Sequence, residues 1–196
     1  MKYVITIGRE YGSGGRFIAK LLAERLGINY YDNELLAKIS EKSGLAEGFI
    51  EQYDEKKESF FNSGINPITC DVSLGCKVYL AQFDAIKSIA EKESCIIVGR
   101  SADHVLKDYP NVLSIFITAP MKDKIERAVK YYNLDPKKAE KIIKKKNKQR
   151  KEYYEYYTDK KWGHSSSYDI CINSKIGVEA CVNVLEAIIK EKMNIK

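Results

Sequence analysis

The chain has 196 residues, 44% of them hydrophobic and 31% charged, a balance typical of one compact domain with a buried core. Lys and Arg number 33 against 27 Asp and Glu, and the formal charge of +6 favours anionic partners such as nucleotide phosphates and, more weakly, nucleic acid. The five cysteines are odd in number and show no CxxC spacing, which argues against both a disulfide framework and a zinc site.

The N-terminal segment enters a strand-like run at once, without a long apolar stretch, and nothing after it resembles a membrane span. We therefore expect a cytoplasmic protein with no membrane partner.

The first elements read as strand, loop, helix and strand. Residues 3–7 form a β-branched and aromatic run, and residues 16–26 carry apolar side chains at helical spacing. Gly27 is suited to end that helix, and residues 28–31 predict a second short strand. This order begins a βαβ unit.

The middle of the chain continues the alternation. Residues 95–98 and 112–118 are almost continuously apolar, as expected of central strands covered by helices on both faces. Residues 77–92 and 122–132 have the spacing of amphipathic helices. Residues 55–75 show no clear period and are interpreted as irregular.

The last third begins with Asp135 and Pro136, a cap and first-turn pair that predicts a helix start. The basic and then tyrosine-rich residues 137–161 favour a solvated helix face. Residues 168–172 predict a final strand, and residues 178–189 a closing amphipathic helix. Together these elements predict a parallel sheet between helices.

A glycine-rich turn, GREYGSGGR over residues 8–16, lies between the first strand and the first helix. In that context backbone N–H groups gather at the positive end of a helix dipole, where phosphate binds well. The alternative is a tight turn without a ligand, because glycines alone are a weak signal.

The segment YGSGGRFIAKLLAERLG resembles the phosphate-binding loop of cytidylate kinases. In that alignment Gly15 stands in the position of the loop lysine, and Arg9 in the position of the first glycine. The lysine normally reaches the β- and γ-phosphates. Either Arg16 or Arg9 could supply the missing cation.

Further motifs follow in the order found in the cytidylate kinase-like family, so the chain resembles that family from residue 3 to about residue 189. They are Tyr31-Asp32, Val98-Gly99-Arg100, Thr118-Ala119-Pro120, Lys160-Lys161-Trp162-Gly163 and Tyr168-Asp169. The resemblance implies an α/β fold: the three-layer α/β/α P-loop kinase fold, with a central parallel sheet and a helical, basic lid. It also implies one domain, with a core of residues 1–32, 94–121 and 165–196, an acceptor-side helical region of residues 33–93, and a lid of residues 122–164.

The family's site implies roles for matching positions. ATP would contact Tyr11, Gly12, Ser13, Gly14, Gly15, Arg16 and Phe17. The acceptor would contact Asp32, Lys38 and Arg100, and the catalytic cations would be Arg16, Arg100, Arg127 and Arg150. Ser101 and Asn147 each replace an Asp of the related kinases. The plainer alternatives are a surface arginine at a strand end for Arg100 and an ordinary helix position for Lys38.

The resemblance implies an ATP- and Mg²⁺-dependent phosphotransferase acting on a nucleoside monophosphate, cytidylate-like, or a related small phosphorylated acceptor. The alternative is a nucleotide-binding regulator or pseudokinase that lacks efficient transfer because of Gly15, and recovery in Gly15→Lys would indicate a decayed enzyme. Nucleic acid is an unlikely partner, although the basic, tyrosine-rich lid raises RNA binding as a third hypothesis. We expect no protein-held metal cluster, and expect the lid aromatics to pack rather than stack on a base.

Overall fold

The computed structural model describes residues 2–32 and 74–194, with the side chains of residues 74–81 not described. Lys38, Asn33 and most of the irregular segment, residues 55–73, lie outside these ranges. None of the described helices combines the length and the apolar character needed to cross a bilayer.

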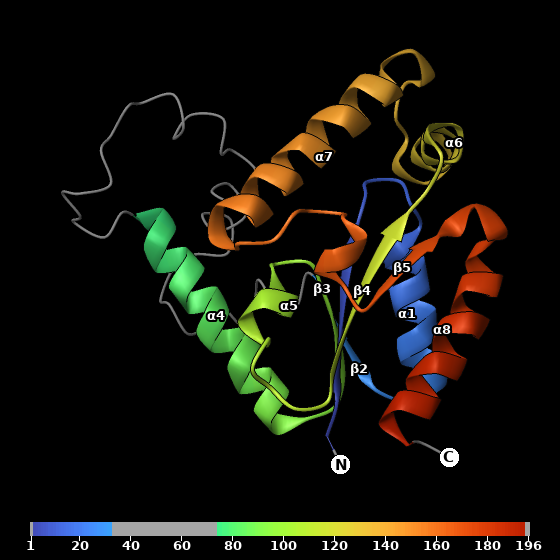
Figure 1. Ribbon diagram of the computed structural model, residues 1–196. Helices are drawn as coiled ribbons and strands as arrows, with labels where there is room; N and C mark the ends of the chain where they lie inside the picture. The colour runs from blue at the N-terminus through green and yellow to red at the C-terminus, as the bar shows by residue number, and fades with distance from the viewer. Residues whose placement is uncertain (1, 33–73, 195–196) are drawn as a thin grey trace.

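Within the described ranges, five parallel strands form one sheet in the order β2-β3-β1-β4-β5 (Figure 1). Their bounds are β1 Val4–Arg9, β2 Asn29–Tyr31, β3 Cys95–Val98, β4 Val112–Thr118 and β5 Ile170–Asn173. Val4 pairs with Cys95 on one side and with Val112 on the other, so β1 lies at the centre. The nearly continuous apolar runs are buried, as predicted for central strands.

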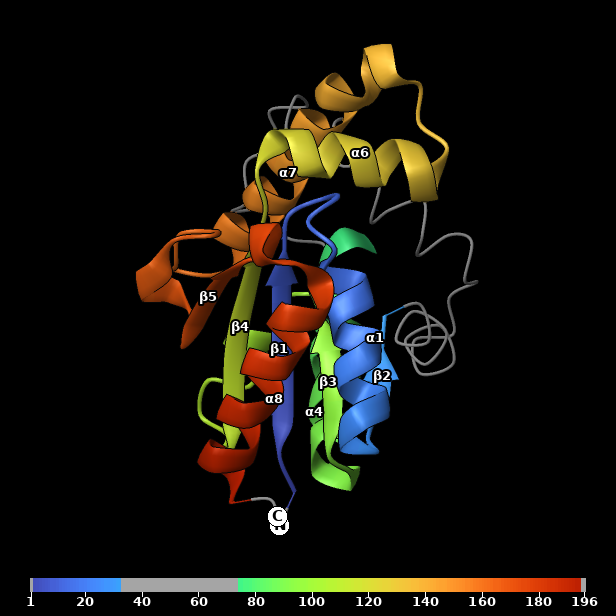
Figure 2. The same cartoon turned by 90° about the vertical axis from the view of Figure 1, so that its right-hand side faces the viewer.

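Helices cover both faces of the sheet, which gives the three layers expected (Figures 1 and 2). The helices α1 Gly15–Leu26 and α8 Val178–Met193 pack on one face over a core that includes Ile5, Ile7 and Ile115. On the other face, α4 Leu74–Lys92 and the short α5 Ala102–Val105 bury Val4 and Ile97. Each face therefore has its own apolar core.

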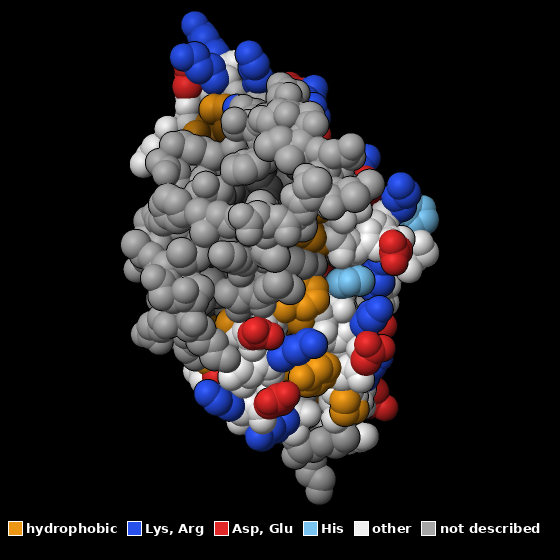
Figure 3. Space-filling view, turned by 90° about the vertical axis from the view of Figure 1, so that its left-hand side faces the viewer, with side chains coloured by type: hydrophobic (Ala, Val, Ile, Leu, Met, Phe, Trp, Pro, Cys, Tyr) orange, Lys and Arg blue, Asp and Glu red, His pale blue; other side chains and the backbone are white. Residues whose placement is uncertain are grey.

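Two more helices lie across the carboxyl ends of the strands (Figure 1). They are α6 Met121–Tyr132 and α7 Pro136–Tyr157, the latter beginning where Asp135 accepts a hydrogen bond from the Lys137 N–H, as predicted. Lys and Arg side chains gather at this end of the molecule, while both signs of charge mix with apolar side chains over the described part of the α4 side (Figure 3).

The predicted boundaries differ from the observed ones by a few residues. The last strand begins at Ile170 rather than residue 168, because the Tyr168 ring is buried against Phe116 and Tyr154. The closing helix continues past residue 189 to Met193, which is buried, and ends at Asn194 in a left-handed conformation. Helix α4 begins at Leu74 rather than residue 77, so the irregular segment ends earlier than expected.

Candidate active site

Residues 10–14 connect β1 to the N-terminus of α1 in a tight loop. The Ser13 N–H and hydroxyl both donate to the Glu10 carbonyl, at 3.3 and 2.9 Å. Gly12 has a φ of 77°, and a Cβ there would lie 2.7 Å from the Lys124 carbonyl oxygen. The loop therefore needs glycine at this position, both for its backbone angle and for the close approach of α6.

The Glu10 carboxylate fixes the loop to the base of α6. Its Oε2 accepts hydrogen bonds from the Thr118 hydroxyl at 2.6 Å and the Ala119 N–H at 3.2 Å, and it pairs with Lys124 Nζ at 3.0 Å. Lys124 is only 5% exposed, so this carboxylate balances a buried charge. Glu10 was not among the predicted site residues, although its position next to the glycine-rich turn could have indicated a role in the loop.

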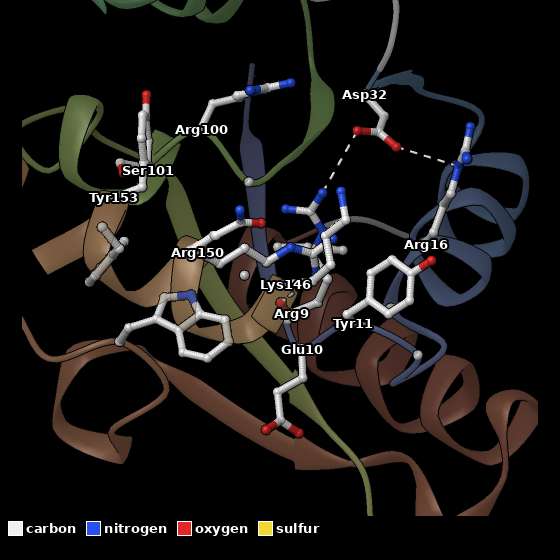
Figure 4. A pocket seen from close by; sticks show the side chains of 18 of the residues that line it. Arg9, Glu10, Tyr11, Arg16, Asp32, Arg100, Ser101, Lys146, Arg150 and Tyr153 are labelled. Atoms are coloured by element: carbon white, nitrogen blue, oxygen red, sulfur yellow. Dashed lines mark hydrogen bonds and ion pairs between the residues drawn. The ribbon is translucent and has the colours of Figure 1, made fainter. Parts of the chain in front are cut away.

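A cavity of about 420 Å³ opens between this loop, the strand ends and α7. Its lining includes cations from three elements, carboxylates and a group of aromatic rings. Among the lining residues are Arg9, Gly15, Arg16, Asp32, Gly99, Arg100, Ser101, Arg150 and Tyr154. Figure 4 shows Arg9 and Arg16 converging on Asp32, with Arg150 beside Arg9 and the Glu10 carboxylate directed away.

Arg9 and Arg150, both only partly exposed, bring two guanidinium groups close together (Figure 4). Arg150 Nη1 donates to the Arg9 carbonyl at 3.1 Å, and its guanidinium lies 5.5 Å from the centre of the Tyr11 ring. Burial, followed by the charge of Arg9, lowers the pKa of Arg150 to about 9. Burial also lowers the pKa of Arg9, against the opposing effect of Asp32. A bound anion beside these two guanidinium groups would favour their charged forms.

Asp32, at the end of β2, is the carboxylate facing these cations. It lies 3.8 Å from Arg9 Nη2 and 3.4 Å from Arg16 Nε, and its Oδ2 accepts a hydrogen bond from the Tyr30 hydroxyl at 3.2 Å. Burial and then the Asp32 charge raise the pKa of Tyr30 to about 12. The Arg16 side chain is 54% exposed and therefore stands at the rim of the cavity.

A further part of the lining follows β3. Arg100 has a φ of 60° and Ser101 a φ of 51°, so the chain turns sharply at the strand end. The Ser101 hydroxyl is buried and has no hydrogen-bond partner among the described residues. A ligand oxygen or nitrogen entering the cavity would satisfy it.

The end of the cavity furthest along α7 is closed by an aromatic and acidic network. Tyr154 donates to Asp103 Oδ2 at 2.7 Å, and Lys160 Nζ lies 3.8 Å from the same oxygen. Burial raises the pKa of Asp103, opposed by the Tyr154 hydrogen bond and Lys160. Trp162 packs edge-on against Phe116. Tyr154 and Trp162 thus pack, as expected, although both also line the cavity.

Most of the predicted site residues lie together around the cavity: Tyr11, Gly12, Gly14, Gly15, Arg16, Asp32, Arg100 and Arg150. Among the described residues, three predicted positions lie outside its lining. Ser13 is buried beneath the loop, Phe17 packs on Tyr131, and Arg127 bonds to the Gly12 carbonyl and to Ser174. Arg127 therefore holds the loop from behind, and a contact with phosphate by Ser13, Phe17 or Arg127 stays a prediction.

The lining does not offer a ready metal site. Over residues 2–32 and 74–194, no group of three or more His, Cys, Asp and Glu side chains is placed to hold an ion. The lining carboxylates Glu10, Asp32 and Asp103 each already face a cation or a hydroxyl. These residues do not fit a protein-held Mg²⁺.

The parallel sheet, the glycine-rich loop leading into α1 and the helical cover over the strand ends define a P-loop kinase fold. The family model of the cytidylate kinase-like family matches residues 4–176, and the chain belongs to that family. It is 30% identical over 174 residues to a cytidylate kinase of Methanosarcina barkeri, covering 87% of each chain.

Solved structures agree with this fold. An uncharacterized protein from Eubacterium ventriosum superposes with a TM-score of 0.74 and 33% identity, over 96% of this chain and 99% of the other. A shikimate kinase from Bacteroides thetaiotaomicron gives a TM-score of 0.58 at 12% identity, over 96% and 98% of the two chains, and shows the shared fold alone.

Proposed function

We propose that the protein is a kinase-type enzyme that transfers a phosphoryl group from ATP to a nucleoside monophosphate, cytidylate-like, or to a related small phosphorylated acceptor. The observation that carries this proposal is a single cavity that joins the N-terminus of α1 to Arg100 and is roofed by α7. One such space can hold a donor and an acceptor in line. The family membership and the cytidylate kinase relatives support the reaction type.

The donor end lies at the loop. The first-turn amides of α1 have no partner within the helix, and the helix dipole is positive there, so the ATP phosphates would lie on the amides of residues 12–16. Mg²⁺ would enter as part of the Mg-ATP substrate rather than as an ion held by the protein.

The acceptor end would lie beyond Arg9, where Arg100 and Ser101 line the cavity. Arg100 would hold the acceptor phosphate through its planar fork. An acceptor phosphate oxygen would attack the γ-phosphorus as the bond to the β–γ bridging oxygen breaks, leaving ADP and the phosphorylated acceptor. Arg150, brought in by α7, would face the charge that develops, and α7 would exclude water.

The direct test incubates the purified protein with Mg-ATP and a panel of nucleoside monophosphates and measures ADP and product. Wild type should transfer to at least one acceptor, and Arg100→Met should raise the KM for that acceptor by roughly tenfold or more, as expected for loss of a charge-assisted bond. Lys107→Met removes one exposed cation nearby and should leave the KM unchanged. No transfer to any acceptor, together with calorimetric ATP binding, would favour the pseudokinase instead.

A further inference from the structure

The side chain of Arg9 fills the space beside Gly15, the position of the usual loop lysine. An ideal Cβ at Gly15 would lie 2.7 Å from the Arg9 Cβ and 3.1 Å from its Cγ. Real Cβ atoms essentially never approach other heavy atoms within 3.0 Å. While Arg9 is present, position 15 therefore cannot carry a side chain without a shift of the loop.

The guanidinium of Arg9 is placed by a second glycine. A Cβ at Gly99 would overlap Arg9 Nη1, and Gly99 has a φ of 79°, which a side chain would strain. From the end of β1, Arg9 thus runs past Gly15 and over the end of β3 towards Asp32. Its charged end lies between the N-terminus of α1 and Arg100, where the two phosphates of a transfer reaction would meet (Figure 4).

The local charge balance favours a polyanion. Arg9, Arg16 and Arg150 share Asp32 as the one lining carboxylate facing them among the described residues, since Glu10 pairs with Lys124 and Asp103 with Tyr154 and Lys160. Arg16 is the rival source of charge, but its side chain is 54% exposed at the rim, whereas that of Arg9 is only 20% exposed. A charge enclosed away from water interacts more strongly with a bound phosphate.

We infer that Arg9 is the catalytic cation that replaces the loop lysine, and that Gly15 is a glycine because the stem of the Arg9 side chain passes over it. This inference rests on the proposed function, because it assigns Arg9 to the transferring phosphate. Its planar fork would hold two oxygens of the terminal phosphate at once, where a lysine offers a point charge. Gly15 is then no sign of a lost activity but the partner of Arg9.

For the Gly15→Lys variant, this inference and the decayed-enzyme alternative predict opposite results: the alternative expects phosphoryl transfer to recover. With Arg9 in place, Gly15→Lys should clash with the Arg9 stem and weaken both folding and ATP binding. Only the double variant Arg9→Gly/Gly15→Lys clears the space and rebuilds the ordinary arrangement. The double variant should transfer phosphate at least tenfold faster than Arg9→Gly alone.

The experiment compares Arg9→Met, Arg16→Met and Lys20→Met, which each remove one positive charge. It measures ATP affinity by calorimetry, thermal stability, and the transfer rate with Mg-ATP. Arg9→Met should lower kcat about 100-fold or more, the loss typical of one transition-state donor, and weaken ATP binding about tenfold. Arg16→Met should lose less than Arg9→Met on both measures. Lys20 is exposed and paired with Glu24, so Lys20→Met should keep the wild-type ATP affinity and transfer rate.

Two results would overturn the inference: Arg9→Met changing only thermal stability, or Gly15→Lys alone raising the transfer rate. If Arg9→Met does not fold, Arg9→Lys is the substitute, because it keeps a cation in the same space. Normal ATP affinity and a normal transfer rate in Arg9→Lys would contradict the role given to the planar guanidinium. If wild type transfers to no acceptor, the proposed function fails, but tenfold weaker ATP binding by Arg9→Met would still support Arg9 as the phosphate-binding cation.

Discussion

Asp169 shows how a residue within a family motif can serve the fold instead of the site. Its carboxylate accepts hydrogen bonds from the Ser114 N–H at 2.7 Å and from the Ser114 hydroxyl at 2.8 Å, and its own N–H donates to that hydroxyl at 3.0 Å. Ser114 lies in β4, so the three bonds attach the segment before β5 to the central sheet. Asp169 does not belong to the cavity lining among the described residues.

Asp169→Ala should therefore lower stability without changing ATP affinity. The change leaves the N–H of the buried Ser114 without its acceptor, which costs about 1–3 kcal/mol. For a chain of this size that corresponds to a fall in Tm of roughly 2–12 °C. Asp108→Ala, at an exposed position, is the matched control. A loss of ATP affinity in folded Asp169→Ala would place this residue in the site after all.

Asp103 provides a pH prediction. Burial raises the pKa of its carboxyl group, so the folded state holds the proton more tightly than the unfolded state. Its contribution to stability is thus greatest at low pH and falls as the pH rises from the unfolded pKa through the folded one. Asp103→Asn keeps an acceptor for Tyr154 and removes the titration. The difference in Tm, variant minus wild type, should increase between pH 4 and pH 7, and a constant difference would contradict the assignment.

At the scale of elements, α7 is tied to the backbone of the phosphate loop itself. Asn147 Oδ1 accepts a hydrogen bond from the Tyr11 N–H at 2.7 Å, and Arg150 donates to the Arg9 carbonyl. From α6, Lys124 and Arg127 hold Glu10 and the Gly12 carbonyl. Hydrogen bonds therefore tie α6 and α7 to the glycine-rich loop, and we expect a change at Asn147 to alter nucleotide binding.

Asn147→Asp should strengthen that tie and weaken ATP binding. A carboxylate accepts the Tyr11 N–H through a charge-assisted bond, worth roughly 1 kcal/mol more than the amide's. The same negative charge, near Arg150, competes with the phosphates for the cations. Tm should rise while the Kd for ATP increases. Asn147→Ala, which removes the acceptor without adding charge, should lower Tm, and if both variants bound ATP more weakly to the same extent, charge competition would be the wrong explanation.

The sequence predicted the existence and type of these elements better than their contacts. Asp135 and Pro136 were enough to predict where α7 begins, because a helix cap is formed by residues that are adjacent in the sequence. The bond between Tyr11 and Asn147 joins residues 136 positions apart, and no local pattern indicates it. No local pattern indicates the contacts of Arg127 either. The family resemblance assigns Arg127 to the lid, whereas in the structure its guanidinium donates to the hydroxyl and the carbonyl of Ser174.

For the whole molecule, the sheet order depends on long-range pairing that apolar runs leave open. The runs at β1, β3 and β4 predicted buried strands, whereas the site was predicted from the glycine-rich turn and the family resemblance. The structure places that turn and the cavity at the edge where the parallel strands end. The sequence does not distinguish a Gly15 that marks a lost lysine from a Gly15 that makes room for Arg9. The difference depends on the path of the Arg9 side chain past Gly15 and Gly99. Such paths are set by packing, which sequence spacing does not encode.

Since both core clusters share the strands of one sheet, the chain should unfold as one unit. Ile97 belongs to the core under α4 and Ile96 to the core under α1, and they are neighbours in β3. Calorimetry should then give one transition whose calorimetric and van't Hoff enthalpies agree. ATP at about 100 times its Kd should raise stability by about 2.7 kcal/mol, which shifts the entire transition by roughly 5–10 °C. Two transitions, with only one moved by ATP, would show that the lid and the sheet fold separately.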